Sequence, residues 1–184
     1  ASYLVGYIAG KTTKTNTAGF VIGMATDVMN EFGYGYLAGV KDANPDANIL
    51  QNNVNSFADT GAGKTAANNM VANNAAAGGT GLGVIDACKE AGIWAIGVDS
   101  DQSKVAPKTI LTSAMKRVDN AVYDEAKAVL DGEYKAGVKT YTLEDGGVDI
   151  APTTDNLSEE LLKEVEDVKA KIVAGEIKVP NNKA

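Results

Sequence analysis

Histidine is absent from the 184 residues of this chain, and cysteine and tryptophan occur once each. Without histidine, Ser-His-Asp triads, histidine general bases and most zinc sites are excluded. A single cysteine, Cys88, also excludes an internal disulfide and a cysteine-metal cluster. Cys88 and Trp94 are both expected in the core. We therefore expect no metal, no cofactor and no enzymatic activity, and the composition favours a binding protein.

Long apolar runs and an excess of basic residues are missing too. No apolar segment approaches the roughly 18 residues of a transmembrane helix, so none is predicted. Lys and Arg number 17 against 24 Asp and Glu, which gives a net charge of −7. Nucleic-acid binding needs a basic patch, and this balance argues against one. The hydrophobic share of 45% is enough for one core, and the length predicts one domain or slightly more.

The N-terminal sequence begins within a helical pattern at Ala1, without a start methionine, a charged n-region or a signal-peptide cleavage motif. We expect the sequence to be a fragment, or the ordered part, of a longer protein. Targeting therefore cannot be read from this end of the chain.

Short apolar runs alternate with helical periodicity along the chain, which predicts an α/β fold with a parallel sheet. The predicted strands are 18–24, 47–54, 93–98, 109–113 and 148–152, with a further extended segment at 138–143. The predicted helices are 27–43, 63–72, 82–92, 115–130 and 161–172, and a loose tail follows Pro180. Gly33, Gly35 and Gly39 are expected to let their helix approach a sheet closely.

One strand is missing from this alternation. The predicted helices 63–72 and 82–92 follow each other, although two helices on one face of a parallel sheet should be separated by a strand. No β-branched or aromatic run lies between Asn74 and Gly78. Our interpretation is that a strand of a handful of residues is absent here; the alternative is a helical hairpin with a glycine turn.

Two glycine motifs invite a nucleotide-binding interpretation. The sequence Gly63-Lys64-Thr65 would need glycine at position 58 to form a phosphate-binding loop, but Ala58 stands there, so a helix start is favoured. The cluster at 78–83 departs from the dinucleotide pattern. Because glycines that open a helix expose backbone N–H groups, this cluster favours a ligand-facing loop over a tight turn.

Several side chains follow predicted strands, where open α/β sheets bind their ligands. Asp99 and Asp101 come directly after one strand, and a carboxylate can accept two hydrogen bonds from a vicinal diol. Turn or capping acids are the alternative, and a paired-carboxylate hydrolase is a weaker one. Phe57 follows another strand and either stacks on a planar ligand or anchors its loop to the core. Lys116 is predicted to begin a helix, where a cation is unfavourable, so ligand binding is favoured.

Five segments, taken in order, resemble the basic membrane protein (BMP) family. They are residues 77–81, 96–102, 112–119, 146–148 and 175–180, and the similarity runs from residue 1 to residue 180. Members of that family are substrate-binding lipoproteins of ABC importers, and their best understood members bind purine nucleosides. They have the type I periplasmic-binding-protein fold, with two lobes and the ligand in the cleft between them.

The resemblance implies that this chain is mostly the second lobe. Residues 1–111 and 147–184 would form that lobe, residues 112–146 would be a returning piece of the first lobe with the hinge, and a strand would precede residue 77. The ligand would be a nucleoside such as guanosine, inosine or adenosine, and the partner an ABC permease. The protein would be extracytoplasmic, held at the membrane by a lipid anchor outside this sequence, or periplasmic.

The same resemblance implies roles for individual residues. Phe57 would stack on the base, and Val28 would touch it. Asp99 and Lys116 would hold the ribose hydroxyls. The remaining two positions would line the cleft: Gly78 and Gly79. Two other functions stay open, namely an effector domain of a regulator with the same fold and, less favoured, a sugar-binding receptor.

Overall fold

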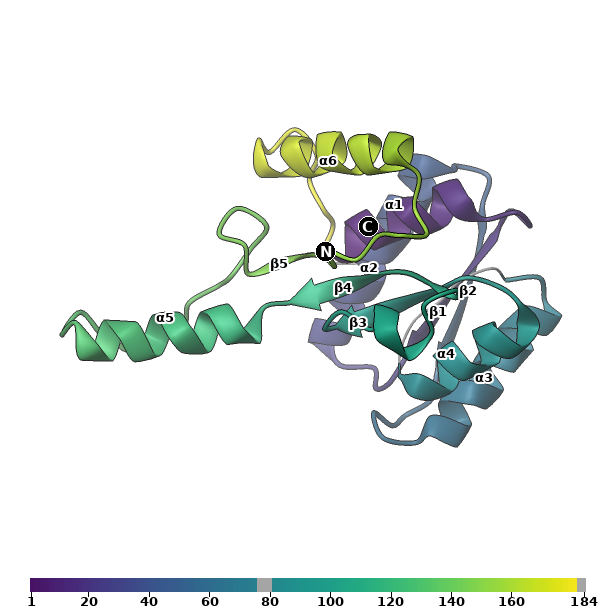
Figure 1. Cartoon of the computed structure of the whole chain (residues 1–184), viewed down its shortest axis with the longest axis horizontal. Helices are drawn as coiled ribbons and strands as arrows, with labels where there is room; N and C mark the ends of the chain where they lie inside the picture. The colour runs from purple at the N-terminus through teal and green to yellow at the C-terminus, as the bar shows by residue number, and fades with distance from the viewer. Residues whose placement is uncertain (76–80, 182–184) are drawn as a thin grey trace.

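The computed structural model describes residues 1–75 and 81–181. The fold is α/β, as predicted, with helices on both sides of the strands (Figure 1). The strands are β1 (Thr17–Ile22), β2 (Asn48–Asn53), β3 (Ala95–Asp99), β4 (Ile110–Lys116) and β5 (Val148–Ile150). The helices are α1 (Ser2–Thr12), α2 (Asp27–Ala43), α3 (Thr60–Ala72), α4 (Leu82–Ala91), α5 (Val118–Leu130) and α6 (Glu159–Val173), with a 3₁₀ turn η1 at Ser103–Val105.

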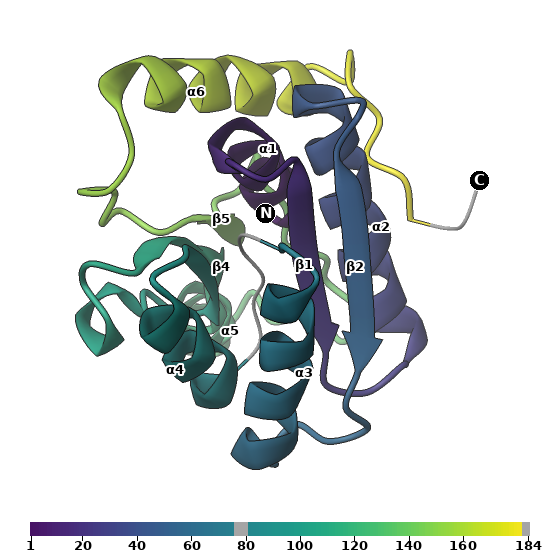
Figure 2. The ribbon, with the colours of Figure 1, turned by 90° about the vertical axis from the view of Figure 1, so that its right-hand side faces the viewer.

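The described strands form two sheets. β1 and β2 pair in parallel and lie side by side in Figure 2. β4 lies between β3, to which it is parallel, and β5, to which it is antiparallel. Between α3 and α4 lie residues 76–80, which are outside the described residues. The missing strand therefore stays a prediction, and so does the loose tail, whose last residues, 182–184, are likewise outside them.

Two clusters of buried side chains cover opposite sides of β1. Ala18, Phe20 and Ile22 point into a cluster with α1, α2 and α6, whereas Val21 points into a cluster with α3 and α4. Both faces of this strand are thus covered by helices, which explains its continuous apolar sequence. Cys88 belongs to the second cluster, as expected for a core residue, and burial raises the pKa of its thiol to about 11. Trp94 is half-buried and packs on the first cluster.

The prediction that the glycines of α2 all let this helix approach a sheet is only partly right. A Cβ atom at Gly33 would lie 3.3 Å from the ring of Phe20 in β1, in line with that expectation. At Gly39, however, a Cβ atom would lie 2.0 Å from the carbonyl oxygen of Tyr3 in α1. Gly39 therefore permits the close approach of two helices, because the N-terminal helix, rather than a strand, covers this part of α2.

Replacing Gly39 by alanine is expected to lower the free energy of unfolding by about 3 kcal/mol, because the new methyl group meets backbone that cannot move aside cheaply. Gly35 provides a matched control in the same helix, since its nearest neighbour would be the Cβ atom of Ser2 at 3.4 Å. Gly35→Ala is expected to be neutral or to stabilise by up to about 1 kcal/mol, the difference in helix propensity. Urea unfolding of both variants measures this, and equal effects would contradict it.

Three predictions for the region after β3 were wrong: the end of one strand, the start of the following helix, and an extended segment. β4 continues to Lys116, and α5 begins only at Val118, so Lys116 ends a strand instead of beginning a helix. The reason is pairing with β5, in which Lys116 lies opposite Val148 and the amide of Arg117 donates to the carbonyl of Gly147 at 2.9 Å. The segment 138–143, predicted as extended, does not form a strand in the described structure.

Residues 118–146, which we call the arm, extend from the body of the molecule (Figure 1). They leave after β4 and return at β5, and the side chain of Asn120 donates to the carbonyl of Gly146 at 3.3 Å where the two crossings meet. None of the residues of α5, all of which the structure describes, is buried. The predicted assignment of residues 112–146 to another lobe stays a prediction; residues 112–116 continue β4 in the sheet.

Candidate functional site

Four of the predicted site residues lie at or just beyond the carboxyl ends of the parallel strands. Asp99 and Lys116 are the last residues of β3 and β4. Val28 lies in the first turn of α2, after β1, and Phe57 lies in the loop after β2. All four side chains are more than half exposed. Gly78 and Gly79 lie outside the described residues, so their predicted role in lining the cleft stays a prediction.

Asp99 and Lys116 are brought together by the pairing of their strands. The Nζ atom of Lys116 lies 2.8 Å from Oδ1 of Asp99, and Asp99 is opposite Met115 in the ladder. The side chain of Asp99 is 59% exposed and that of Lys116 is 51% exposed. An exposed ion pair of this kind contributes about 0–1 kcal/mol. A ligand with hydroxyl groups can therefore insert between the two charges, or displace one, at little cost.

Asp101 accepts hydrogen bonds within its own turn, unlike Asp99. Its Oδ1 atom accepts a hydrogen bond from the amide of Ser103 at 3.0 Å. Partial burial would raise the pKa of the Asp101 carboxyl, but hydrogen bonds from Thr153 and Ser103 outweigh it and lower the pKa. The interpretation as a turn acid thus fits Asp101, whereas the carboxylate of Asp99 meets a cation at the strand end.

Phe57 is held outside the core. Its side chain is 62% exposed, which contradicts the alternative of an anchor folded into the core. A Cβ atom at Gly23, just past β1, would lie 2.4 Å from Cδ1 of the Phe57 ring, so the ring rests on the backbone there. The amides of Ala58 and Asp59 donate to Oγ of Ser56 at 3.1 and 3.0 Å, which fixes the turn beside the ring.

Gly23 is a site residue that the sequence reasoning missed. The signal was a glycine directly after a buried strand, at the edge where ligands bind. A side chain at position 23 would occupy the space that the ring of Phe57 takes up. The glycine-lysine motif, in contrast, behaves as predicted: it lies within α3, which Asp59 caps by accepting from the amide of Ala62 at 2.8 Å, and Lys64 pairs with Glu90 at 2.7 Å.

The ends of the strands carry groups that suit hydroxyl groups on the β3–β4 sheet and a planar ring beside the β1–β2 sheet. The carboxylate of Asp99 accepts hydrogen bonds, the ammonium group of Lys116 donates them, and Phe57 offers an aromatic face. The described residues contain no group of three His, Cys, Asp or Glu side chains placed to hold a metal ion. Among the helices that the structure describes, none has both the length and the apolar character needed to cross a membrane.

Side chains at the carboxyl ends of parallel strands are where open α/β sheets bind ligands, and the fold is that of periplasmic-binding-protein-like solute-binding proteins, such as the solved one described below. The chain belongs to the Bmp family, described as ABC transporter substrate-binding protein PnrA-like, whose family model matches residues 1–183. This confirms the predicted family and fold class.

Known proteins resemble the chain along almost its whole length. It is 41% identical to the CD4+ T-cell-stimulating antigen of Listeria monocytogenes, over 97% of this chain and 56% of the relative. It is 35% identical to the ABC transporter nucleoside-binding protein BmpA of Lactococcus lactis, over 98% of this chain and 58% of the relative. A solved ABC transporter solute-binding protein of Aeropyrum pernix has a TM-score of 0.86 at 28% identity, over 98% of this chain and 64% of that one.

The lengths of these matches are informative in two ways. The chain spans little more than half the length of the curated relatives. The match to the Listeria protein runs over 201 positions, more than the 184 residues of this chain, so that relative has residues inside the matched region that this chain lacks. The match does not place those residues along the chain, so the strand missing between the predicted helices 63–72 and 82–92 stays a prediction.

Proposed function

We propose that this chain forms most of the second lobe of an ABC importer's substrate-binding protein, which binds a purine nucleoside between two lobes. The observation that carries the proposal is the Asp99–Lys116 pair at the ends of β3 and β4, in a chain of the Bmp family. One relative, at 35% identity, is named as nucleoside-binding. A nucleoside also matches the chemistry of the site, since it carries a vicinal diol and a planar base.

In this proposal each side chain meets one part of the ligand. Asp99 accepts hydrogen bonds from the ribose hydroxyls, and Lys116 donates to a ribose oxygen. The exposed ring of Phe57 stacks on the base, while Val28 contacts its edge. The resemblance assigns Gly78 and Gly79 to the lining of the cleft.

The mechanism is a change of conformation without a chemical step. A ligand that touches both lobes favours the closed state over the open one, and a permease that recognises the closed state then accepts the loaded protein. The arm is the natural link to a first lobe, because both of its crossings lie beside the carboxyl end of β4. The protein would act outside the cytoplasm, periplasmic or held by a lipid anchor outside this sequence.

Calorimetric titration of the natural polypeptide that contains residues 1–184 tests this function. Guanosine, inosine and adenosine are compared with free ribose and with guanine, and native mass spectrometry of the purified protein reports any retained ligand. We expect micromolar or tighter binding of at least one nucleoside, and weaker binding of the sugar and the base. Binding of a sugar without any nucleoside would indicate a sugar receptor, and binding of none of these compounds would overturn the proposal.

A further inference from the structure

The loop after β3 is closed by one glutamine side chain. Oε1 of Gln102 accepts a hydrogen bond from the amide of Val98 at 3.0 Å, four residues earlier in the chain. The amide of Gln102 donates to Oγ of Ser113 in β4 at 3.1 Å. Residues 98–102 therefore form a loop that is closed by a hydrogen bond and bound by another to the neighbouring strand β4, and Asp99 lies within that loop.

Asp99 adopts a backbone conformation that needs such support. Its φ is +68°, in the left-handed region, and the amide of Ser100 donates to the carbonyl of Val98 at 2.8 Å across it. A hydrogen bond between residues two apart, with positive φ at the residue between them, is a rare and strained turn. Residues in such conformations persist only where their surroundings fix them. The surroundings here are the side chain of Gln102, the bond from the main-chain amide of Gln102 to Ser113, and the pairing of Asp99 with Met115 in the ladder.

The packing around this loop leaves it little freedom. Ser113 is fully buried, at 0% exposure. A Cβ atom at Gly97 would lie 2.3 Å from Oγ of Ser113 and 2.7 Å from Oε1 of Gln102. Oγ of Ser113 and Oε1 of Gln102 thus pack against the backbone of β3 at Gly97, two residues before Asp99. Gln102 and Ser113 therefore pack directly against the chain that leads into the strained turn at Asp99.

We propose that Gln102 and Ser113 are positioning residues that hold Asp99 where it meets the ribose hydroxyls of a nucleoside, and so set the preference for ribose over deoxyribose. The identity of the ligand in this inference rests on the proposed function, whereas the control of the Asp99 backbone does not. Gln102 and Ser113 act through Asp99 and need not touch the ligand themselves.

The control of the backbone is tested without ligand. Amide hydrogen exchange of Ser100 is measured by NMR in the natural polypeptide, because this amide closes the turn at Asp99 but is not itself bound by Gln102 or Ser113. We expect Gln102→Met and Ser113→Ala to speed its exchange roughly tenfold, in line with the loss of one hydrogen bond. Gln102→Glu keeps an oxygen acceptor and should retain the protection. Unchanged exchange in both Gln102→Met and Ser113→Ala would overturn the proposal.

The preference for ribose is tested with guanosine and 2′-deoxyguanosine. We expect Gln102→Met to weaken guanosine binding roughly tenfold and 2′-deoxyguanosine binding less, because the deoxynucleoside has only its 3′ hydroxyl to donate to Asp99. The ratio of the two affinities therefore falls. A general loss of structure would weaken both equally. Gln51→Met, at an exposed position of strand β2, is the control for removal of a glutamine and should leave both affinities unchanged.

The outcomes separate the two proposals. If the unaltered protein binds guanosine and prefers it to 2′-deoxyguanosine, but Gln102→Met keeps that preference, the positioning role is wrong and the proposed function stands. If the unaltered protein binds no nucleoside, the proposed function and the ribose preference fail together. The exchange of Ser100 then still decides whether Gln102 and Ser113 control the backbone at Asp99.

Discussion

Asp99→Asn is expected to weaken guanosine binding by the natural polypeptide roughly a hundredfold, the equivalent of about 3 kcal/mol. Hydrogen bonds to a charged acceptor contribute about 1.5–3 kcal/mol each, and a carboxylate can accept two from a vicinal diol, whereas the neutral amide keeps a single oxygen. Asparagine is the informative replacement because it tolerates the left-handed conformation of Asp99, with φ of +68°. The loss of affinity then reports on the carboxylate and not on the backbone.

Asp101→Asn is the matched control for this variant. It removes the same charge two residues further on, while its amide oxygen can still accept from the amide of Ser103. We expect its affinity for guanosine to stay within about threefold of the unaltered protein, which corresponds to a change below 1 kcal/mol. Equal losses in both variants would point to a general effect of charge, and full affinity in Asp99→Asn would remove Asp99 from the site.

The placement of the site at the carboxyl ends of the strands was predictable from the sequence. The sequence indicates where the strands β2 and β3 end. A side chain that follows either strand lies at the edge of its sheet, whichever strand it pairs with. This is why Phe57 and Asp99 were found as candidates. The exposure of the Phe57 side chain confirms its position outside the core.

Contacts between segments far apart in the chain could not be predicted in the same way. Lys116 was assigned to a helix because the helical periodicity continues through it, but pairing with Val148 extends β4 instead. Three other contacts are of the same kind. Gly39 lies close to Tyr3, the ring of Phe57 packs against Gly23, and the amide of Gln102 donates to Ser113. Each depends on which element lies alongside, and a local pattern does not contain that information.

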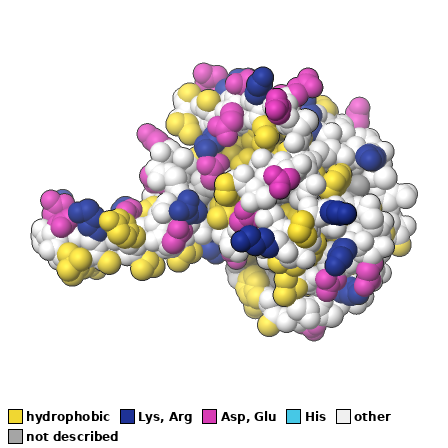
Figure 3. Space-filling view, viewed as in Figure 1, with side chains coloured by type: hydrophobic (Ala, Val, Ile, Leu, Met, Phe, Trp, Pro, Cys, Tyr) yellow, Lys and Arg dark blue, Asp and Glu magenta, His cyan; other side chains and the backbone are white. Residues whose placement is uncertain are grey.

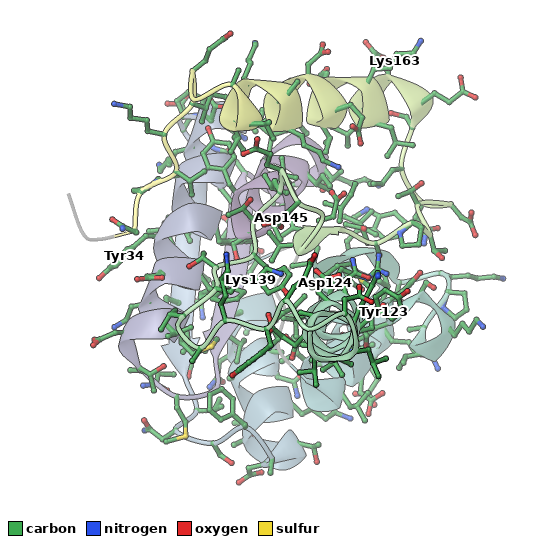
Figure 4. All side chains as sticks on the ribbon, turned by 90° about the vertical axis from the view of Figure 1, so that its left-hand side faces the viewer. Tyr34, Tyr123, Asp124, Lys139, Asp145 and Lys163 are labelled. Carbon is green, nitrogen blue, oxygen red and sulfur yellow. The ribbon has the colours of Figure 1, made fainter. Side chains whose placement is uncertain are left out.

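The arm raises the question of what covers its apolar side. Several large apolar side chains of α5 are more than half exposed: Val118, Val122, Tyr123, Val129 and Leu130. Figure 3 shows hydrophobic side chains along the arm. The charged side chains Asp124 and Glu125 face the loop that follows α5, where Nζ of Lys139 lies 3.6 and 3.9 Å from them (Figure 4). Exposed large apolar side chains gathered on one helix are typical of a surface that contacts a partner.

The relatives indicate which partner to test. The chain spans 56% of the length of the Listeria protein, so most of the remaining length is available to form a first lobe. We expect that lobe to bury the apolar side of α5 in the natural polypeptide. A second copy of the chain is the alternative occupant, and it predicts association of residues 1–184 that depends on concentration.

Val122→Asp is therefore expected to destabilise the natural polypeptide strongly and residues 1–184 alone hardly at all. In the natural polypeptide it should lower the free energy of unfolding by about 3 kcal/mol or more, because an unpaired carboxylate is forced into an apolar interface. In residues 1–184 alone, where Val122 is 64% exposed, the change should stay within about 0.5 kcal/mol. Urea unfolding of both forms measures the difference.

Asp124→Lys supplies the control, since Asp124 lies on the opposite side of α5 from Val122, where its carboxylate is 3.6 Å from Nζ of Lys139. It alters the charge more than Val122→Asp does, yet it should cost less than about 1 kcal/mol in either context, as expected for an exposed ion pair. Similar costs for Val122→Asp in the two contexts would contradict burial by a first lobe. Sedimentation of residues 1–184 as a dimer that Val122→Asp dissociates would assign the same surface to a second copy, because a contact made by the isolated chain needs no further lobe.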